Sequence, residues 1–177
     1  MAYEISEFPP LSWSFSRMKT LIDCPRKYYY NFYGYHNGWL KDAEEEAQTT
    51  YRLKKLNAID ALFGQVFHEK VKATIKEKSG VHLVPDTFRR AINRAIKSAY
   101  IDSKSSLSEW IMHPNWYKMI SEVYYDGDIC GTKKESIAQK ANISSTNLYA
   151  SSTFKELTER GDVGSSICGV LLLFPHF

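Results

Sequence analysis

Apolar residues recur at steps of three and four along most of this chain, which is the spacing of amphipathic helices. A first helix has an apolar face made of Met18, Leu21 and Ile22. The serines that precede this face are candidate caps: Ser12, Ser14 and Ser16. A second helix begins at Pro25, where the missing N–H costs nothing, and ends near Gly34. The stretch "YHNGW" that follows predicts a turn.

A longer helical pattern covers residues 41–78. Its apolar positions are Leu53, Leu56, Ile59, Phe63, Val66, Phe67, Val71 and Ile75. Gly64 interrupts this pattern. Because a glycine inside a helix costs roughly 1 kcal/mol relative to alanine, we expect either a break or close packing at this position.

The second half of the chain is also mainly helical by this criterion. Asp86 is a natural cap for a helix that continues to about Lys104, and three more helices are predicted over residues 116–125, 133–142 and 151–157. Only the apolar run over residues 166–174 has the pattern of a buried strand. The predicted fold class is therefore mainly α, with short strands at the C-terminus.

Composition changes this picture only slightly. The 177 residues suffice for one domain with a core of its own, and a net charge of +3 does not by itself indicate nucleic-acid binding. The distribution of charge adds more, because cations gather over residues 51–80 and 86–104. The second group consists of Arg89, Arg90, Arg94, Lys97 and Lys104. Such cations contact phosphates in DNA-binding proteins, although solvated helix faces carry the same pattern.

Three widely spaced cysteines, Cys24, Cys130 and Cys168, do not form a disulfide framework. The N-terminus has neither the basic nor the apolar segment of a signal peptide, and the longest apolar run is far below the ~20 residues of a membrane helix. We therefore expect a cytoplasmic protein that does not interact with membranes.

Most catalytic motifs are missing from this sequence. It has no glycine-rich phosphate loop, no nucleophile elbow, no Cys-x-x-Cys pair and no His-x-x-x-His pair. Among its five histidines, His68 stands out because it follows Gly64 by one helical turn. A helical histidine beside Glu69 and Lys70 is usually a surface residue, so its interpretation depends on a second motif.

That second motif is "SFSRMKTLIDCPRKYYYNFYG", in which a serine-led helix runs into Cys24-Pro25-Arg26-Lys27 and a cluster of aromatic residues. Together with the later Gly-x-x-x-His element of "FGQVFHEKV", it resembles the RecB-type branch of the PD-(D/E)XK nuclease superfamily. The resemblance is good over residues 11–80 and loose to about residue 160. It implies that residues 11–160 are the helical part of an α/β restriction-endonuclease-like domain, with an incomplete strand region over residues 161–177.

The resemblance also implies a function, namely phosphodiester hydrolysis in DNA with Mg²⁺ or Mn²⁺. In that family a histidine at the position of His68 contributes to the metal site, while the main ligands are an Asp and a (Asp/Glu)-x-Lys on adjacent strands. Carboxylate oxygens suit Mg²⁺, and the lysine helps to position the attacking water.

The family's carboxylates are hard to find in this chain. The only (Asp/Glu)-x-Lys triplet is Asp102-Ser103-Lys104, and Asp86 precedes it by sixteen residues, but the pattern places both acids on one predicted helix. Asp162 has no later (Asp/Glu)-x-Lys partner. We therefore expect a truncated family member that is inactive alone and retains His68 but lacks the catalytic sheet.

Two further hypotheses concern the N-terminal motif. Some relatives use the cysteine at the position of Cys24 as the first of four ligands to an iron–sulfur cluster. The other cysteines of this chain do not complete such a set, so we favour a small buried cysteine and no cluster. We expect the aromatic residues from Tyr28 to Tyr35 to be buried against the helix of His68, and stacking on single-stranded bases is the alternative.

Arg26 and Lys27 are candidates for contacts with DNA phosphates. The resemblance also implies DNA as the partner, and a helicase or another repair or defence subunit as a further one. The alternative function is a non-catalytic helical module that binds nucleic acid or a protein.

Overall fold

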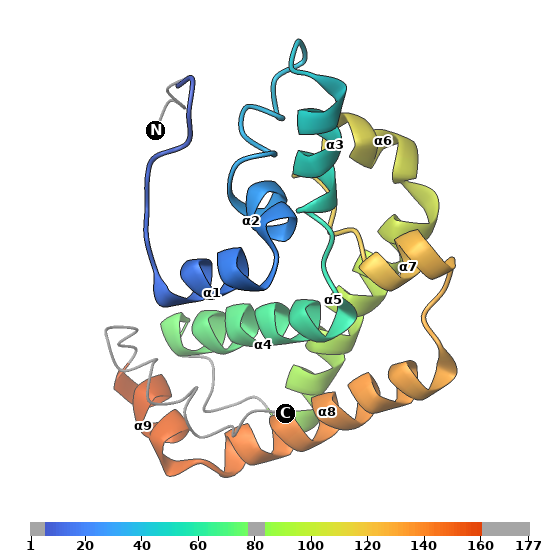
Figure 1. Cartoon of the computed structure of the whole chain (residues 1–177). Helices are drawn as coiled ribbons and strands as arrows, with labels where there is room; N and C mark the ends of the chain where they lie inside the picture. The colour runs from blue at the N-terminus through green and yellow to red at the C-terminus, as the bar shows by residue number, and fades with distance from the viewer. Residues whose placement is uncertain (1–5, 78–83, 161–177) are drawn as a thin grey trace. The chain divides into compact units, whose positions relative to one another are not determined.

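The structure, a computed structural model, describes residues 6–77 and 84–160. Within these ranges the chain is mainly helical, as predicted, and its β-type pairing is limited to a single bridge (Figure 1). The predicted strand over residues 166–174 lies outside the described residues, as do Asp162 and Cys168. None of the helices in the described ranges has the length and hydrophobicity that a bilayer span requires.

The chain forms two compact units, and the first is called the aromatic unit here. It consists of residues Met1–Leu56 and Ser108–Lys118, and it holds all four tryptophans of the sequence. Its helices are α1 (Phe15–Asp23), α2 (Pro25–Phe32), α3 (Glu45–Leu53) and all but the first residue of α6 (Leu107–Met112).

The start of the aromatic unit follows the predicted elements. Ser14 is the cap of α1, because its hydroxyl accepts a hydrogen bond from the backbone N–H of Arg17 at 3.2 Å. Pro25 occupies the first turn of α2. Within the aromatic unit α2 has no buried residue and Tyr29 is exposed, and burial of the aromatic cluster against the helix of His68 stays a prediction. Cations lie over several of these rings, as described below.

The second unit, the core unit, consists of residues Asn57–Leu107 and Met119–Phe177. Its helices are α4 (Ile59–Lys76), α5 (Pro85–Ser105), α7 (Ser121–Asp126), α8 (Gly131–Ala150) and α9 (Ser152–Arg160). The central helix is α5, which packs against α4, α7 and α8, while α9 folds back against α4 and α8 (Figure 1). A continuous hydrophobic cluster fills the space between these helices and includes Leu62, Ile75, Ile92 and Leu148.

The long helical pattern of residues 41–78 is in fact two helices, and its break does not lie at Gly64. The chain leaves the helical conformation after Leu53, and α4 begins at Ile59. Gly64 lies inside α4, and a Cβ atom built there would meet no heavy atom of the described residues within 4 Å. The predictions of a break or of close packing at this glycine are therefore both wrong for the described part of the chain.

A long-range contact explains why the break falls where it does. Asn57 pairs with Ile120 in a parallel bridge: its N–H donates to the carbonyl of Met119, and its carbonyl accepts from the N–H of Ser121, both at 2.9 Å. This pairing requires extended backbone at Asn57. The hydroxyl of Ser103 on α5 accepts the N–H of Ile120 at 2.9 Å, which joins the bridge to the central helix.

Candidate nucleic-acid interface

A row of exposed cations follows one face of α5 in the core unit. Arg90, Arg94 and Lys97 are separated by four and three residues, so they lie on one side of the helix, and all three are exposed. The buried positions of the same helix, such as Ile92 and Ile96, lie on the side of the hydrophobic cluster. We call these three residues the α5 cation row.

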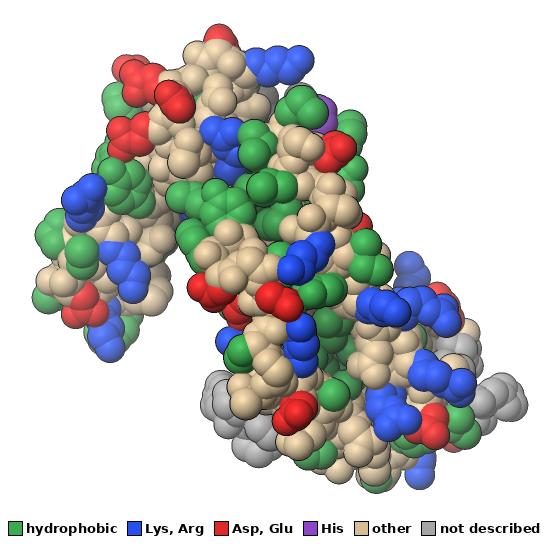
Figure 2. Space-filling view, turned by 90° about the vertical axis from the view of Figure 1, so that its right-hand side faces the viewer, with side chains coloured by type: hydrophobic (Ala, Val, Ile, Leu, Met, Phe, Trp, Pro, Cys, Tyr) green, Lys and Arg blue, Asp and Glu red, His purple; other side chains and the backbone are tan. Residues whose placement is uncertain are grey.

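The α5 cation row is not neutralised within the described part of the chain. Arg90 donates its Nε–H to the backbone carbonyl of Asp86 at 3.3 Å, and none of the three forms an ion pair with a described carboxylate. Figure 2 shows Lys and Arg side chains gathered in the lower part of one face of the molecule. Cations without acidic partners keep their electrostatic attraction for an external anion.

Arg26 and Lys27 lie in the first turn of α2, in the aromatic unit, and both are exposed. Cys24 is half-buried and is the cap of this helix, because its Sγ accepts a hydrogen bond from the N–H of Lys27 at 3.4 Å. The guanidinium carbon of Arg26 lies 5.9 Å from the ring centre of Tyr30. The thiol at this position thus has a local role in the structure, and the two cations beside it are accessible to phosphates.

Other cations of the aromatic unit lie over aromatic rings. The guanidinium carbon of Arg17 is 4.3 Å from the centre of the Phe32 ring, and Lys54 Nζ is 3.3 Å from the centre of the Tyr35 ring. Lys54 also donates to the carbonyl of Asn31 at 2.5 Å. Desolvation beside the ring lowers the pKa of Lys54, and the positive charges of Arg17 and Lys55 lower it further. These contacts fix the aromatic side chains of α2 and of the turn after it.

His68 is half-buried on α4 of the core unit. No group of three or more His, Cys, Asp or Glu side chains that could hold a metal ion occurs in the described ranges. Mg²⁺ takes six or so oxygen ligands, and a single imidazole does not provide them. The described surroundings of His68 therefore do not fit a complete Mg²⁺ or Mn²⁺ site.

The structure does not bring Asp86, Asp102 and Lys104 together. Asp86 lies in the first turn of α5 and Asp102 in its last, and sixteen residues of helix separate them by about 24 Å along the axis. Asp86 pairs with Arg89 at 2.8 Å, and Lys104 donates to the carbonyl of Gly127. The predicted cap was misplaced by two residues, because Val84 is at the cap position and Pro85 opens the helix.

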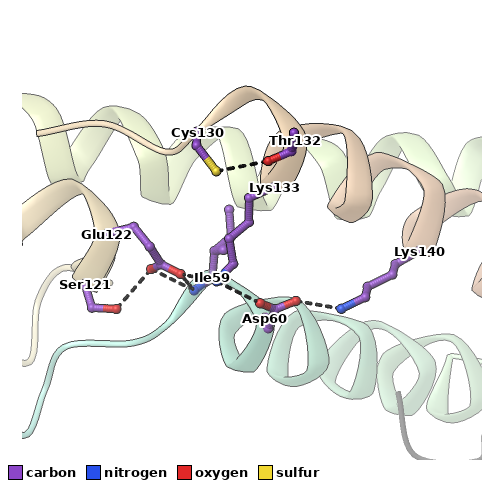
Figure 3. A network of polar contacts seen from close by, with 8 residues as sticks. All are labelled: Ile59, Asp60, Ser121, Glu122, Cys130, Thr132, Lys133 and Lys140. Carbon is purple, nitrogen blue, oxygen red and sulfur yellow. Dashed lines mark hydrogen bonds and ion pairs between the residues drawn. The ribbon is translucent and has the colours of Figure 1, made fainter. Parts of the chain in front are cut away.

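A polar network joins α4, α7 and α8 in the core unit (Figure 3). Lys133 of α8 contacts Asp60 at 3.2 Å and Glu122 at 3.0 Å, and Lys140 contacts Asp60 at 2.6 Å. The carboxylate of Glu122 also accepts the N–H of Ile59 at 3.1 Å, which satisfies a free donor at the start of α4. Sequence patterns gave no sign of this network, because its members come from three separate helices.

The pKa values in this network favour the charged forms. Hydrogen bonds from Lys140 and then Lys133 lower the pKa of Asp60. Partial burial raises the pKa of Glu122, but hydrogen bonds from Lys133, Ser121 and backbone N–H groups outweigh it, so the net shift is downward. The bonds to Glu122 and Asp60 raise the pKa of Lys133. Since each charge has a partner of opposite sign, the arrangement fits a structural clamp and not a metal site.

Cys130 lies at the end of the same network, at the cap position of α8, and is exposed. Its Sγ is 3.3 Å from Thr132 Oγ1. The hydrogen bond from this hydroxyl lowers the pKa of the thiol, and the N–H and the charge of Lys133 lower it further. A lowered pKa favours the thiolate, which is the nucleophilic form of cysteine.

Comparison with known proteins does not place this chain in a class. No model of a protein family, no curated protein and no solved structure matches it.

Proposed function

We propose that this chain binds DNA and is the helical part of a nuclease of the RecB-like PD-(D/E)XK type, with a restriction-endonuclease-like fold. The observation that carries the DNA-binding part is the α5 cation row, whose three exposed cations have no carboxylate partner among the described residues. Arg26 and Lys27, exposed at the start of α2, provide a second group of cations. Each cation that neutralises a phosphate releases counterions, which is the main source of affinity for a nucleic-acid backbone.

The nuclease part of the proposal rests on the order and spacing of the N-terminal motif and the Gly64–His68 element. Hydrolysis by that type of enzyme needs carboxylates beside His68, and the described residues do not supply them. The catalytic carboxylates would therefore come from residues outside the described ranges or from another chain. A helicase or another repair or defence subunit remains a candidate for such a partner. Binding without cleavage is the second candidate function, and the same observation at His68 favours it.

The DNA-binding proposal is tested by fluorescence anisotropy with labelled single-stranded and duplex DNA over a range of salt concentrations. The variant Arg90→Gln/Arg94→Gln/Lys97→Gln removes the α5 cation row. Losing three phosphate contacts should reduce the slope of log K against log salt by about 2 to 3 and weaken binding roughly tenfold or more at low salt.

The matched control is Lys19→Gln/Lys76→Gln/Lys155→Gln, which removes the same charge from three exposed positions on α1, α4 and α9. Its slope should stay close to that of the wild type. An equal loss of affinity in both variants would show that net charge alone determines binding. A wild-type protein that binds neither single-stranded nor duplex DNA would contradict the proposal.

Cleavage is tested on the same DNA with Mg²⁺ or Mn²⁺, for the wild type and for His68→Ala. Metal-dependent cutting that His68→Ala abolishes would support a nuclease that is active in this chain. DNA binding without any cutting, in a folded sample, would support the non-catalytic alternative.

A further inference from the structure

A cavity of about 550 Å³ lies within the aromatic unit. Three segments line it: the turn at residues 38–41, the middle of α3 and the chain at residues 111–116. Its volume is in the range of small-molecule sites, which run from about 300 to 1,000 Å³. None of the site residues predicted from the sequence lies in its wall.

One wall of this cavity is an aromatic platform. The rings of His113 and Trp116 are stacked, with their centres 4.0 Å apart and their planes inclined by 13°. Trp116 nevertheless remains 71% exposed. One face of the indole thus contacts His113, and most of the side chain is still accessible to a planar ligand.

The remaining walls are held in place by contacts within the unit. The ring centre of Trp39 lies 5.8 Å from that of Tyr51, whose hydroxyl accepts a hydrogen bond from Asn115 Nδ2 at 3.0 Å. Gln48 Nε2 donates to the carbonyl of Lys41 at 3.1 Å and so fixes the turn against α3. A cavity that is formed before the ligand arrives loses less entropy on binding.

Gly38 makes this arrangement possible. A Cβ atom at this position would lie 2.2 Å from the carbonyl oxygen of Ala47, so only glycine lets the turn approach α3 this closely. The glycine of the "YHNGW" turn therefore shapes the cavity wall.

The lining of the cavity is positively charged. Lys41 and Arg52 contribute to it, and no Asp or Glu does. Arg52 donates to the carbonyl of Gln48 and to Thr49 Oγ1, both at 3.2 Å. It forms no ion pair with a described carboxylate. An open indole beside two such cations selects a flat ring that carries a negative group.

We infer that this cavity binds an unpaired base of single-stranded DNA, with the base stacked on Trp116 and its phosphate at Arg52 and Lys41. This inference rests on the proposed function, because it takes DNA as the ligand. It adds a preference: a base inside a duplex cannot leave its stack without cost, so the cavity should favour single strands.

The test compares Trp116→Ala with the matched control Trp13→Ala, which removes a 76% exposed tryptophan of the same unit that does not line the cavity. Anisotropy is measured with a labelled single-stranded oligonucleotide and with a blunt duplex. Losing one stacked base should weaken single-strand binding by Trp116→Ala about 5- to 150-fold. Duplex binding by Trp116→Ala and single-strand binding by Trp13→Ala should be unchanged.

Two further variants distinguish the loss of a binding contact from a disturbance of the folded structure. Trp116→Phe keeps a ring and should retain most of the single-strand affinity. Arg52→Gln should weaken single-strand binding and reduce its salt slope by about 0.7, which is one phosphate contact. Far-UV circular dichroism checks that each variant is folded.

Each outcome decides between the two proposals. If Trp116→Ala binds single strands as the wild type does while duplex binding persists, the cavity inference fails and the DNA-binding proposal stands. An equal loss of single-strand and duplex binding would also overturn the inference, since stacking would not be specific to unpaired bases. If the wild type binds neither DNA, both proposals fail.

Discussion

The two units of this chain are stabilised in different ways. The hydrophobic cluster of buried residues lies wholly in the core unit, where α4, α5, α8 and α9 enclose it. In the aromatic unit neither α1 nor α2 has a buried residue, and cations such as Arg17 and Lys54 lie over the rings. One unit thus derives its stability from apolar burial, while the other keeps aromatic surface and positive charge accessible. We expect stability to depend mainly on the core unit and the stacking of an unpaired base on the aromatic unit, while the α5 cation row of the core unit provides contacts with phosphates.

The largest expected effect compares two leucines. Leu62 is fully buried in the core unit and Leu21 is 42% exposed in the aromatic unit. Leu62→Ala should lower the free energy of unfolding by about 2–5 kcal/mol, because it leaves a cavity. Leu21→Ala should cost less than about 1 kcal/mol. Urea unfolding followed by far-UV circular dichroism measures both, and tryptophan fluorescence reports on the aromatic unit alone, since it holds all four tryptophans. Equal costs would remove the distinction between the units.

The next effect concerns the polar network that joins α4, α7 and α8 in the core unit. Glu122 is 17% exposed, pairs with Lys133 and accepts the N–H of Ile59 at the start of α4. Glu122→Gln should lower the free energy of unfolding by about 1–2 kcal/mol, because Lys133 loses a charged partner and the helix start loses an anion. The control is Glu156→Gln on α9, whose 57% exposed carboxylate pairs with Arg160, and it should cost less than about 0.5 kcal/mol. Thermal unfolding of both variants would measure the difference. Equal decreases in melting temperature would show that the polar network does not stabilise the core unit.

The sequence predicted most of the helices because their apolar faces are local patterns. It located α1, α2, α5 and α9 to within a few residues. It misplaced the break near Gly64, since the pairing of Asn57 with Ile120 that ends the helical run joins residues far apart in the chain. It also left α8 too short, because the polar second half of that helix has little apolar periodicity.

The candidate interface was predictable to a smaller extent. Arg26 and Lys27 were found from the motif around Pro25, and both are exposed. The cavity was not predicted, because Trp39 and Trp116 come from distant segments and only the folded unit brings their surroundings together. The doubtful catalytic match of Asp86 with Asp102 and Lys104 failed because the two acids lie at opposite ends of α5. The metal-site role of His68 stays a prediction.

Lowering the pH should reduce the stability of the core unit, because Asp128 becomes protonated. The hydroxyl of Tyr100, the N–H of Ile129 and the ammonium of Lys134 hydrogen-bond to this carboxylate and lower its pKa from 3.8 to about 2. Between these two values the unfolded chain binds more protons than the folded one, so stability falls as the pH is lowered from about 4 to about 2. The melting temperature of Asp128→Asn should therefore depend less steeply on pH in this range than that of the wild type. Parallel curves would show that Asp128 is not the group that responds.

The smallest expected effect tests whether cation–ring contacts stabilise the aromatic unit. Lys54 lies over Tyr35, whereas the ring of Tyr29 is exposed and none of the described cations lies over it. A double-mutant cycle with Lys54→Met and Tyr35→Leu should give a coupling free energy of about 0.5–1 kcal/mol, measured by urea unfolding with tryptophan fluorescence. The cycle that pairs Lys54→Met with Tyr29→Leu should give a coupling near zero. If neither cycle shows a coupling, apolar contact and not the ammonium of Lys54 fixes the ring of Tyr35. The two units would then differ only in the amount of apolar surface that each one buries.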